Sequence, residues 1–171
     1  MQIVLARIDD RLIHGQVVVG WVTYTGANHI VVINDTVAKN EMQRTLLEIA
    51  VPVHLRVTIC TVDEAPSKIN DVEFKNDKGL LLFTNPIDVQ KLLGKCNAFE
   101  SLNVGGMKFS PGKKEVLKSV YLNTRDAITL LKLNECGIEI EGRMVPTDKK
   151  VDVVKYIKDH RENFLGKNEK N

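Results

Sequence analysis

The chain has 171 residues and is 43% hydrophobic, which is enough for one buried core but too short for two domains of ordinary size. The 24 Lys and Arg residues nearly balance the 22 Asp and Glu residues, giving a net charge of +2. This balance argues against a broad basic surface for nucleic acid. No leader-like or membrane-spanning apolar run is present, so we predict a single soluble domain over residues 1–165 and a polar tail over 166–171.

The three cysteines, Cys60, Cys96 and Cys136, form neither a C-x-x-C pair nor a disulfide framework. We therefore expect buried free thiols in a reducing cytosol.

Strand and helix patterns alternate along the chain. Periodicity predicts strands over residues 2–8, 29–34, 55–60, 79–83, 101–104, 116–122 and 138–145. It predicts helices over 15–24, 37–50, 63–70, 84–94, 124–137 and 149–164, with Thr124 as an N-cap. Such alternation is typical of an α/β fold with a mostly parallel sheet, right-handed crossovers and helices on both faces, which is a three-layer sandwich.

The segment after the first predicted strand predicts a histidine that handles phosphate. His14 is the candidate nucleophile, because a neutral imidazole can form a covalent bond to a phosphoryl group near pH 7. Arg11 presents a charged fork that matches phosphate oxygens, and Arg7 adds positive charge. Gly15 and Gln16 lie where the helix begins, where free backbone N–H groups can hold an anion.

A plainer interpretation of the same segment stays open. Asp9, Asp10 and Arg11 are also compatible with a solvated turn, and His14 with an ordinary residue at a helix start. If the site is functional, Asp9 or Asp10 can orient Arg11 or His14, or repel wrong anions.

Small or polar residues follow several other strands. In open parallel sheets, ligands bind outside the carboxyl ends of the strands, so these loops are expected to gather at one edge. Plain turn and capping chemistry also explains each loop taken singly. The candidate supporting residues from these loops are Asn34, Asp35, Thr84 and Gly105.

Other possible sites carry less signal. His29, His54 and His160 are expected to be structural or solvated. The segment 106–114 lacks the glycine spacing and the final Ser or Thr of a P-loop, so we reject a nucleotide hydrolase. The residues suggest no metal site and no cofactor.

Four segments together resemble a known family. They are Arg-Ile-Asp-Asp-Arg-Leu-Ile-His-Gly-Gln-Val at residues 7–17, Val-Ile-Asn-Asp at 32–35, Phe-Thr-Asn-Pro at 83–86 and Asn-Val-Gly-Gly-Met at 103–107. The chain resembles the IIB component of the mannose/fructose/sorbose family of bacterial sugar phosphotransferase systems over about its whole length. The first segment is the distinctive one.

The resemblance implies a roughly seven-stranded sheet and a phosphotransferase activity. His14 would accept a phosphoryl group from a IIA phosphohistidine and pass it to a sugar entering through the membrane IIC/IID components. Arg11 would bind the phosphoryl group, aided by Asp10, Gly15 and Gln16. The protein would be cytoplasmic and would associate transiently with the inner face of the membrane.

Two other function classes stay open from the residues. One is a binding module that holds a sugar phosphate or a nucleotide without covalent change. The other is a histidine phosphatase, although no second acid-base histidine lies close to His14 in sequence. The sequence does not decide the sugar, the phosphorylated imidazole nitrogen, the particular IIA partner or whether a homo-oligomer forms.

Overall fold

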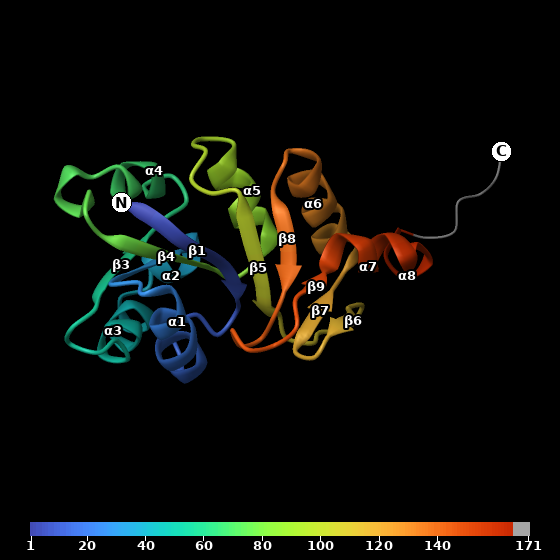
Figure 1. The fold of residues 1–171 in the computed structure, drawn as a ribbon, viewed down its shortest axis with the longest axis horizontal. Coiled ribbons are helices and arrows are strands. Elements are labelled where there is room, and N and C mark those ends of the chain that lie inside the picture. Colours follow the sequence, from blue (N-terminus) through green and yellow to red (C-terminus); the bar gives the residue numbers. More distant parts are fainter. Residues whose placement is uncertain (166–171) are drawn as a thin grey trace.

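The computed structural model describes residues 1–165, and the predicted polar tail lies outside this range. A seven-stranded sheet runs through the molecule in the order β3-β2-β4-β1-β5-β8-β9, and every neighbouring pair is parallel except β8 and β9 (Figure 1). The mostly parallel sheet is therefore confirmed. Its strands are β1 (Gln2–Asp9), β2 (His29–Ile33), β3 (Arg56–Cys60), β4 (Lys78–Phe83), β5 (Ser101–Gly106), β8 (Glu139–Gly142) and β9 (Val151–Asp152).

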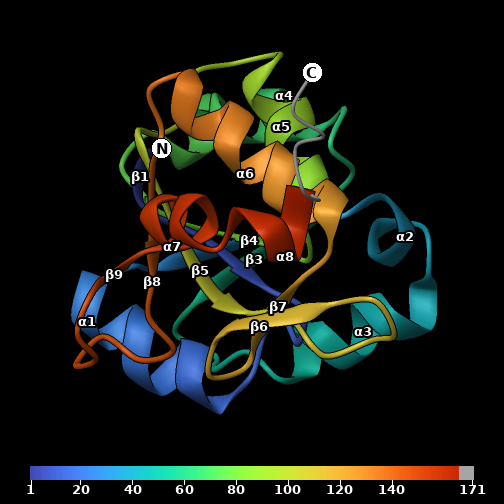
Figure 2. The same ribbon diagram turned by 90° about the vertical axis from the view of Figure 1, so that its right-hand side faces the viewer.

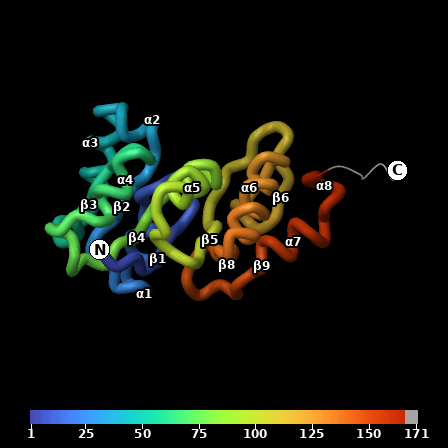
Figure 3. The backbone as a smooth tube through the Cα atoms, turned by 90° about the horizontal axis from the view of Figure 1, so that it is seen from above, coloured from blue at the N-terminus to red at the C-terminus, as the bar shows by residue number. Residues whose placement is uncertain are grey.

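Helices cover both faces of this sheet (Figure 2), and each face has its own apolar core. Seen from above, the strands follow the order of the sheet from left to right (Figure 3). Trp21 anchors the core beneath one set of helices, and Phe83 anchors the other core. The first set is η1 (Gln16–Val22), α1 (Thr23–Thr25), α2 (Asp35–Ala38) and α3 (Glu41–Ile49). The second set is α4 (Ala65–Ile69), α5 (Pro86–Leu93), α6 (Thr124–Glu135), α7 (Val153–Asp159) and α8 (Arg161–Leu165). A short 3-10 turn, η2 (Val72–Phe74), was not predicted.

The predicted helix over residues 37–50 is wrong in its extent, because the chain forms two helices there. Asn34 caps α2 by accepting from Thr36 N and Val37 N, and Asn40 starts α3 by accepting from Gln43 N. A side chain that caps a helix N-terminus ends the preceding structure, so two caps make two helices. The first predicted helix also differs, since residues 16–22 are wound as a π-helix.

The predicted strand over residues 116–122 is instead a hairpin. Its strands β6 (Lys114–Leu117) and β7 (Val120–Leu122) pair antiparallel and form a separate two-stranded sheet, with Ser119 at a left-handed φ of 67° in the turn (Figure 2). Strand β5 extends beyond its predicted end through both glycines to Gly106. The N-cap of α6 is Asn123, not Thr124, because Asn123 and Asp126 form a reciprocal capping box.

The C-terminal third differs most from prediction. The strand predicted over 138–145 ends at Gly142, and three of its four residues are buried, so it does not expose one face. The helix predicted over 149–164 begins only at Val153, after β9, and breaks at His160 into α7 and α8. Pairing of β9 with β8 competes with helix formation at these residues, which local periodicity does not reveal.

The cysteines are free, but only Cys60 is buried, whereas Cys96 is half-buried and Cys136 is exposed. Burial raises the pKa of the Cys60 thiol to about 12. Within residues 1–165, no helix combines the length and the apolar character needed to cross a bilayer.

Candidate active site

Asp9 is the centre of the site. It is the last residue of β1, and its carboxylate is fully buried. Its Oδ2 lies 2.8 Å from Arg7 Nη2 and 2.9 Å from His14 Nε2. Its Oδ1 lies 3.4 Å from Arg11 Nε and accepts a hydrogen bond of 3.2 Å from the Arg11 backbone N–H. One carboxylate thus joins both arginines and the histidine of the predicted site.

The Asp9 carboxylate is ionised despite its burial. Burial by itself would raise its pKa, but hydrogen bonds and charge from His14 and Arg7 outweigh that effect and lower the pKa to about 2. A fixed negative charge therefore faces His14 Nε2 at neutral pH.

The loop after Asp9 turns sharply. Leu12 N–H donates to Asp9 O at 2.9 Å, and Leu12 adopts a left-handed φ of 56° while its side chain is buried. Such a conformation costs about 1 kcal/mol in a residue with a side chain. Asp10 points away from Asp9, and its carboxylate accepts from Lys108 N–H at 2.8 Å. The two adjacent carboxylates therefore serve different contacts.

Arg11 and the helix start flank His14. Arg11 Nη2 donates to Gln16 Oε1 at 2.8 Å, and half of the Arg11 side chain is exposed. The His14 carbonyl accepts from Val17 N–H and Val18 N–H, so His14 lies at the beginning of η1. A half-exposed guanidinium and a helix start on one loop form a place where an anion can bind.

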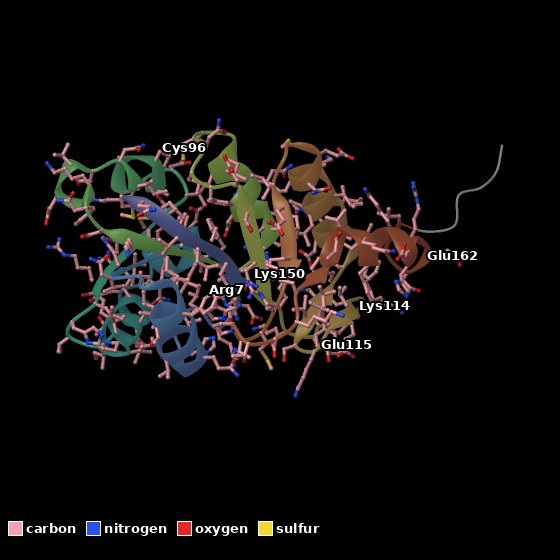
Figure 4. The ribbon with its side chains drawn as sticks, viewed as in Figure 1. Arg7, Cys96, Lys114, Glu115, Lys150 and Glu162 are labelled. Carbon is pink, nitrogen blue, oxygen red and sulfur yellow. The ribbon has the colours of Figure 1, made fainter. Side chains whose placement is uncertain are left out.

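Arg7 lies inside the protein near the carboxyl end of β1 (Figure 4). Its Nη1 donates to Asn103 Oδ1, and burial lowers its pKa against the opposing effect of Asp9. The neighbouring β5 backbone must be bare here, since a Cβ on Gly105 would lie 1.8 Å from Arg7 Nη1 and one on Gly106 would lie 2.7 Å from Asp9 Oδ1. Gly105 thus supports the site by leaving space.

The other predicted supporting residues form a neighbouring network. Asn34 Nδ2 donates to Thr84 Oγ1 at 2.9 Å and to Asp88 Oδ2 at 3.1 Å. Asp35 Oδ1 accepts from Val62 N–H at 2.8 Å. These residues follow β2 and β4 at the same edge of the sheet as Asp9. Asn34 bonds to Thr84 and caps α2, whereas Asp35 bonds to the loop after β3.

Sequence reasoning missed Asn103 as a contact of Arg7, because the pairing of β1 with β5 that places these two residues opposite each other leaves no local pattern. It also did not place Trp21 at the site, although the Arg7 guanidinium carbon lies 5.1 Å from the centre of the Trp21 ring. Both contacts join segments distant in sequence. In residues 1–165, no group of three His, Cys, Asp or Glu side chains is placed to hold a metal ion.

The fold and the site define a class of protein. It is an α/β domain with a histidine oriented by a buried carboxylate and a half-exposed arginine, both at the end of a central strand. Comparison with known protein families supports this class. The family of sorbose-subfamily IIB components of the phosphotransferase system (PTS) matches residues 3–168. The chain therefore belongs to this family and is a phosphotransferase that accepts phosphate from a IIA component and passes it to a sugar at a IIC/IID transporter. Membership also decides against the binding module and the phosphatase.

Individual relatives are similar over nearly the whole chain. The sorbose-specific EIIB component of Klebsiella pneumoniae is 37% identical over 92% of this chain and 96% of that protein. The crystal structure of the IIBSor domain of the sorbose permease from the same organism has a TM-score of 0.88 and 36% identity, over 93% of this chain and 98% of that one. The mannose-specific EIIAB component of Escherichia coli K12 is 40% identical over 92% of this chain and 49% of that protein.

Proposed function

We propose that His14 is the residue that carries the phosphoryl group and that its Nδ1 atom forms the bond to phosphorus. The 2.9 Å contact between His14 Nε2 and the ionised Asp9 carboxylate carries this proposal. A carboxylate only accepts hydrogen bonds, so Nε2 must hold the proton of the neutral imidazole. The lone pair then lies on Nδ1, which is the nucleophile.

Arg11 and the helix start would hold the phosphoryl group. When the group moves from a IIA phosphohistidine, a P–N bond breaks in the donor and a P–N bond forms at Nδ1 of His14. Arg11 is tethered by Asp9 and Gln16 but half-exposed, so its guanidinium can contact the phosphoryl oxygens without a large rearrangement. The backbone N–H groups of Gly15 and Gln16 supply further donors, and positioning with charge stabilisation suffices for a loose transition state.

In the second step, the P–N bond breaks and a P–O bond forms to a sugar hydroxyl, which releases its proton to solvent. Nδ1 regains its lone pair, while the proton stays on Nε2 and Nε2–H still donates to the Asp9 carboxylate. We place the protein in the cytoplasm, docking briefly on IIC/IID at the membrane. A IIA partner is supported by the mannose-specific EIIAB relative, in which this chain matches about half of the protein.

The sugar is set by the membrane partner in this proposal. Relatives with 35 to 40% identity are named for sorbose, mannose and N-acetylgalactosamine, so a common carrier fold accompanies different sugars.

The proposal predicts one phosphorylated histidine. Incubation with phosphoenolpyruvate, the two general phosphotransfer proteins and a matching IIA should give the chain an acid-labile, base-stable phosphate. Phosphorus NMR of the product should show the Nδ1 isomer of phosphohistidine. His14→Ala should abolish the label because it removes the nucleophile.

His54→Ala is the matched control, since His54 is exposed on a loop. It should be phosphorylated like the native chain. Equal labelling of His14→Ala and the native chain would contradict the role of His14, and an Nε2 isomer would contradict the role of Asp9.

A further inference from the structure

Trp21 lies close to two guanidinium groups. It is the single tryptophan of the chain and is fully buried in η1. The guanidinium carbons of Arg7 and Arg143 each lie 5.1 Å from the centre of its ring. Two cations over one indole ring require a framework that holds both, because the cations repel each other.

The loop after β8 supplies part of that framework from its backbone. The carbonyl of Arg143 accepts from Arg7 Nη1 at 3.0 Å, and the carbonyl of Met144 accepts from Arg7 Nη2 at 3.1 Å. The Met144 carbonyl also accepts from Trp21 Nε1 at 3.1 Å. Within residues 1–165, Arg7 Nε is the one buried side-chain polar atom that lacks a hydrogen-bond partner. Arg7 is therefore placed by its two terminal nitrogens, and this loop provides two of their acceptors.

The Arg143 side chain fixes the loop. Its Nε and Nη2 donate to the two oxygens of Glu141, each at 3.0 Å, and its Nη1 donates to Pro146 O at 3.1 Å. Glu141 Oε1 also accepts from Asn103 Nδ2 at 2.9 Å, and Asn103 in turn accepts from Arg7. The contacts close a ring around the Arg7 guanidinium. Bidentate pairing of this kind is geometrically specific and depends on the arginine fork.

We propose that Arg143 is a positioning residue for phosphoryl transfer at His14. The hydrogen bonds of its side chain go to Glu141 and Pro146 and not to the imidazole. Arg143 fixes the loop whose carbonyls accept hydrogen bonds from Arg7. Arg7 in turn positions the Asp9 carboxylate, and this carboxylate accepts the hydrogen bond from His14 Nε2–H. The inference rests on the proposed function, since it takes Nδ1 of His14 as the nucleophile. Misplacing a reacting group by about 1 Å can cost about a hundredfold in rate, so remote contacts of this kind matter.

The charges that face this chain of contacts are few. Asp9 faces Arg7, Arg11 and His14. Arg7 faces Asp9 and, at longer range, Glu141 and Arg11, and the Arg143 guanidinium lies near the same Trp21 ring as Arg7. An exchange of Arg143 for lysine keeps this charge balance and removes only the fork that grips both Glu141 oxygens and Pro146.

Arg143→Lys tests the proposal. We expect kcat for phosphoryl transfer from a phosphorylated IIA to fall about tenfold. KM for the IIA should stay within about twofold, because no docking residue changes. Nitrogen-15 NMR of the neutral His14 imidazole should show the Nε2-protonated tautomer in the native chain and a mixture with the Nδ1-protonated form in the variant. Trp21 fluorescence should also change, since one of its two cations moves.

Arg125→Lys is the matched control, because Arg125 is exposed on α6. It should leave kcat, the tautomer and the fluorescence unchanged. A merely structural role for Arg143 would lower the thermal midpoint while the folded variant kept native kcat and a native tautomer, and this result would overturn the proposal.

Glu141→Gln provides a second variant if Arg143→Lys does not fold. Glutamine keeps the shape but lacks the charge and the second acceptor that Arg143 needs, so kcat and the tautomer should shift in the same direction. Native values in folded Glu141→Gln would overturn the proposal. Failure of the proposed function is distinguishable, because it would appear in the native chain as a phosphate on another residue or on Nε2 of His14.

Discussion

Asp9 and Arg7 form an ion pair that is fully buried. The packing around this pair leaves no room for a side chain on the neighbouring residues Gly105 and Gly106. Both side chains have zero exposed area, and their nearest charged atoms are 2.8 Å apart. Removing one member of such a pair leaves an uncompensated buried charge, which is far more costly than the net stabilisation that the pair provides. The glycines of β5 lie beside this pair, and the site requires them because any side chain there would overlap Arg7 or Asp9.

Gly105→Ala should destabilise the protein and disturb the site. The new Cβ would lie 1.8 Å from Arg7 Nη1, so the buried guanidinium or the strand must move. Overpacking of this kind costs about 1 to 3 kcal/mol. Urea unfolding should show this loss in the free energy of unfolding, together with slower phosphorylation.

Gly15→Ala is the matched control for this prediction. Gly15 has a right-handed helical φ of −52°, and a Cβ there meets nothing within 4 Å. Its free energy of unfolding should change by less than about 0.5 kcal/mol. Equal destabilisation by the two substitutions would show that Gly105 does not make room for Arg7.

Four helix starts in this chain are set by asparagine side chains. Asn34, Asn40, Asn85 and Asn123 each accept a hydrogen bond from backbone N–H groups in the first turn of the following helix. At α6 the sequence offers two capping residues in a row, and local pattern alone chose the wrong one. Asn123 has the extended backbone of an N-cap, whereas Thr124 already belongs to the helix.

Asn123→Ala should lower the free energy of unfolding by about 1 kcal/mol, because it removes the side-chain oxygen that accepts from Asp126 N–H. Thr124→Ala should change it by less than about 0.5 kcal/mol, since Thr124 is exposed and alanine favours a helix. Chemical denaturation of both variants measures the difference. A larger loss of stability in Thr124→Ala than in Asn123→Ala would show that Thr124, and not Asn123, is the N-cap of α6.

The stability of the whole molecule should fall in two steps as the pH decreases. Burial lowers the pKa of His29 below 6.5, against the opposing charge of Asp77 and with smaller effects of Arg56 and the N-terminus. The stability from neutral His29 is therefore present above pH 6.5 and is lost as the pH falls through its folded pKa. The Asp9 pKa falls from 3.8 to about 2, so its contribution is present above pH 3.8 and is lost toward pH 2.

Urea unfolding measured from pH 8 to pH 2 should resolve these steps. His29→Gln should remove the upper step and leave the lower one. His160→Gln is the control, because His160 is exposed and its replacement should leave both steps in place. An upper step that persists in His29→Gln would assign it to another group.

Local residue patterns along the chain were sufficient to predict the fold class, and the loop after the first strand was sufficient to predict the candidate nucleophile. Period-two apolar runs alternate with helical periods, and this local pattern determines a mostly parallel sheet. The cluster of Arg11 and His14 directly after a strand indicates phosphate chemistry. This prediction is accessible from the sequence because it depends only on residue types and their short spacing. The predicted fold class therefore agrees with the structure, whereas several element bounds predicted from the same local patterns do not.

Tertiary structure alone decided the contacts between distant segments. Asp9 Oδ2 lies 2.9 Å from His14 Nε2, and the loop after β8 contacts Arg7 from 136 positions away in sequence. Pairing with β8 converts residues 151–152 from a predicted helix into β9. Local patterns record neither burial nor the direction of a side chain. The sequence by itself therefore predicted a candidate histidine, while packing at the carboxyl ends of the strands decided how His14 is oriented.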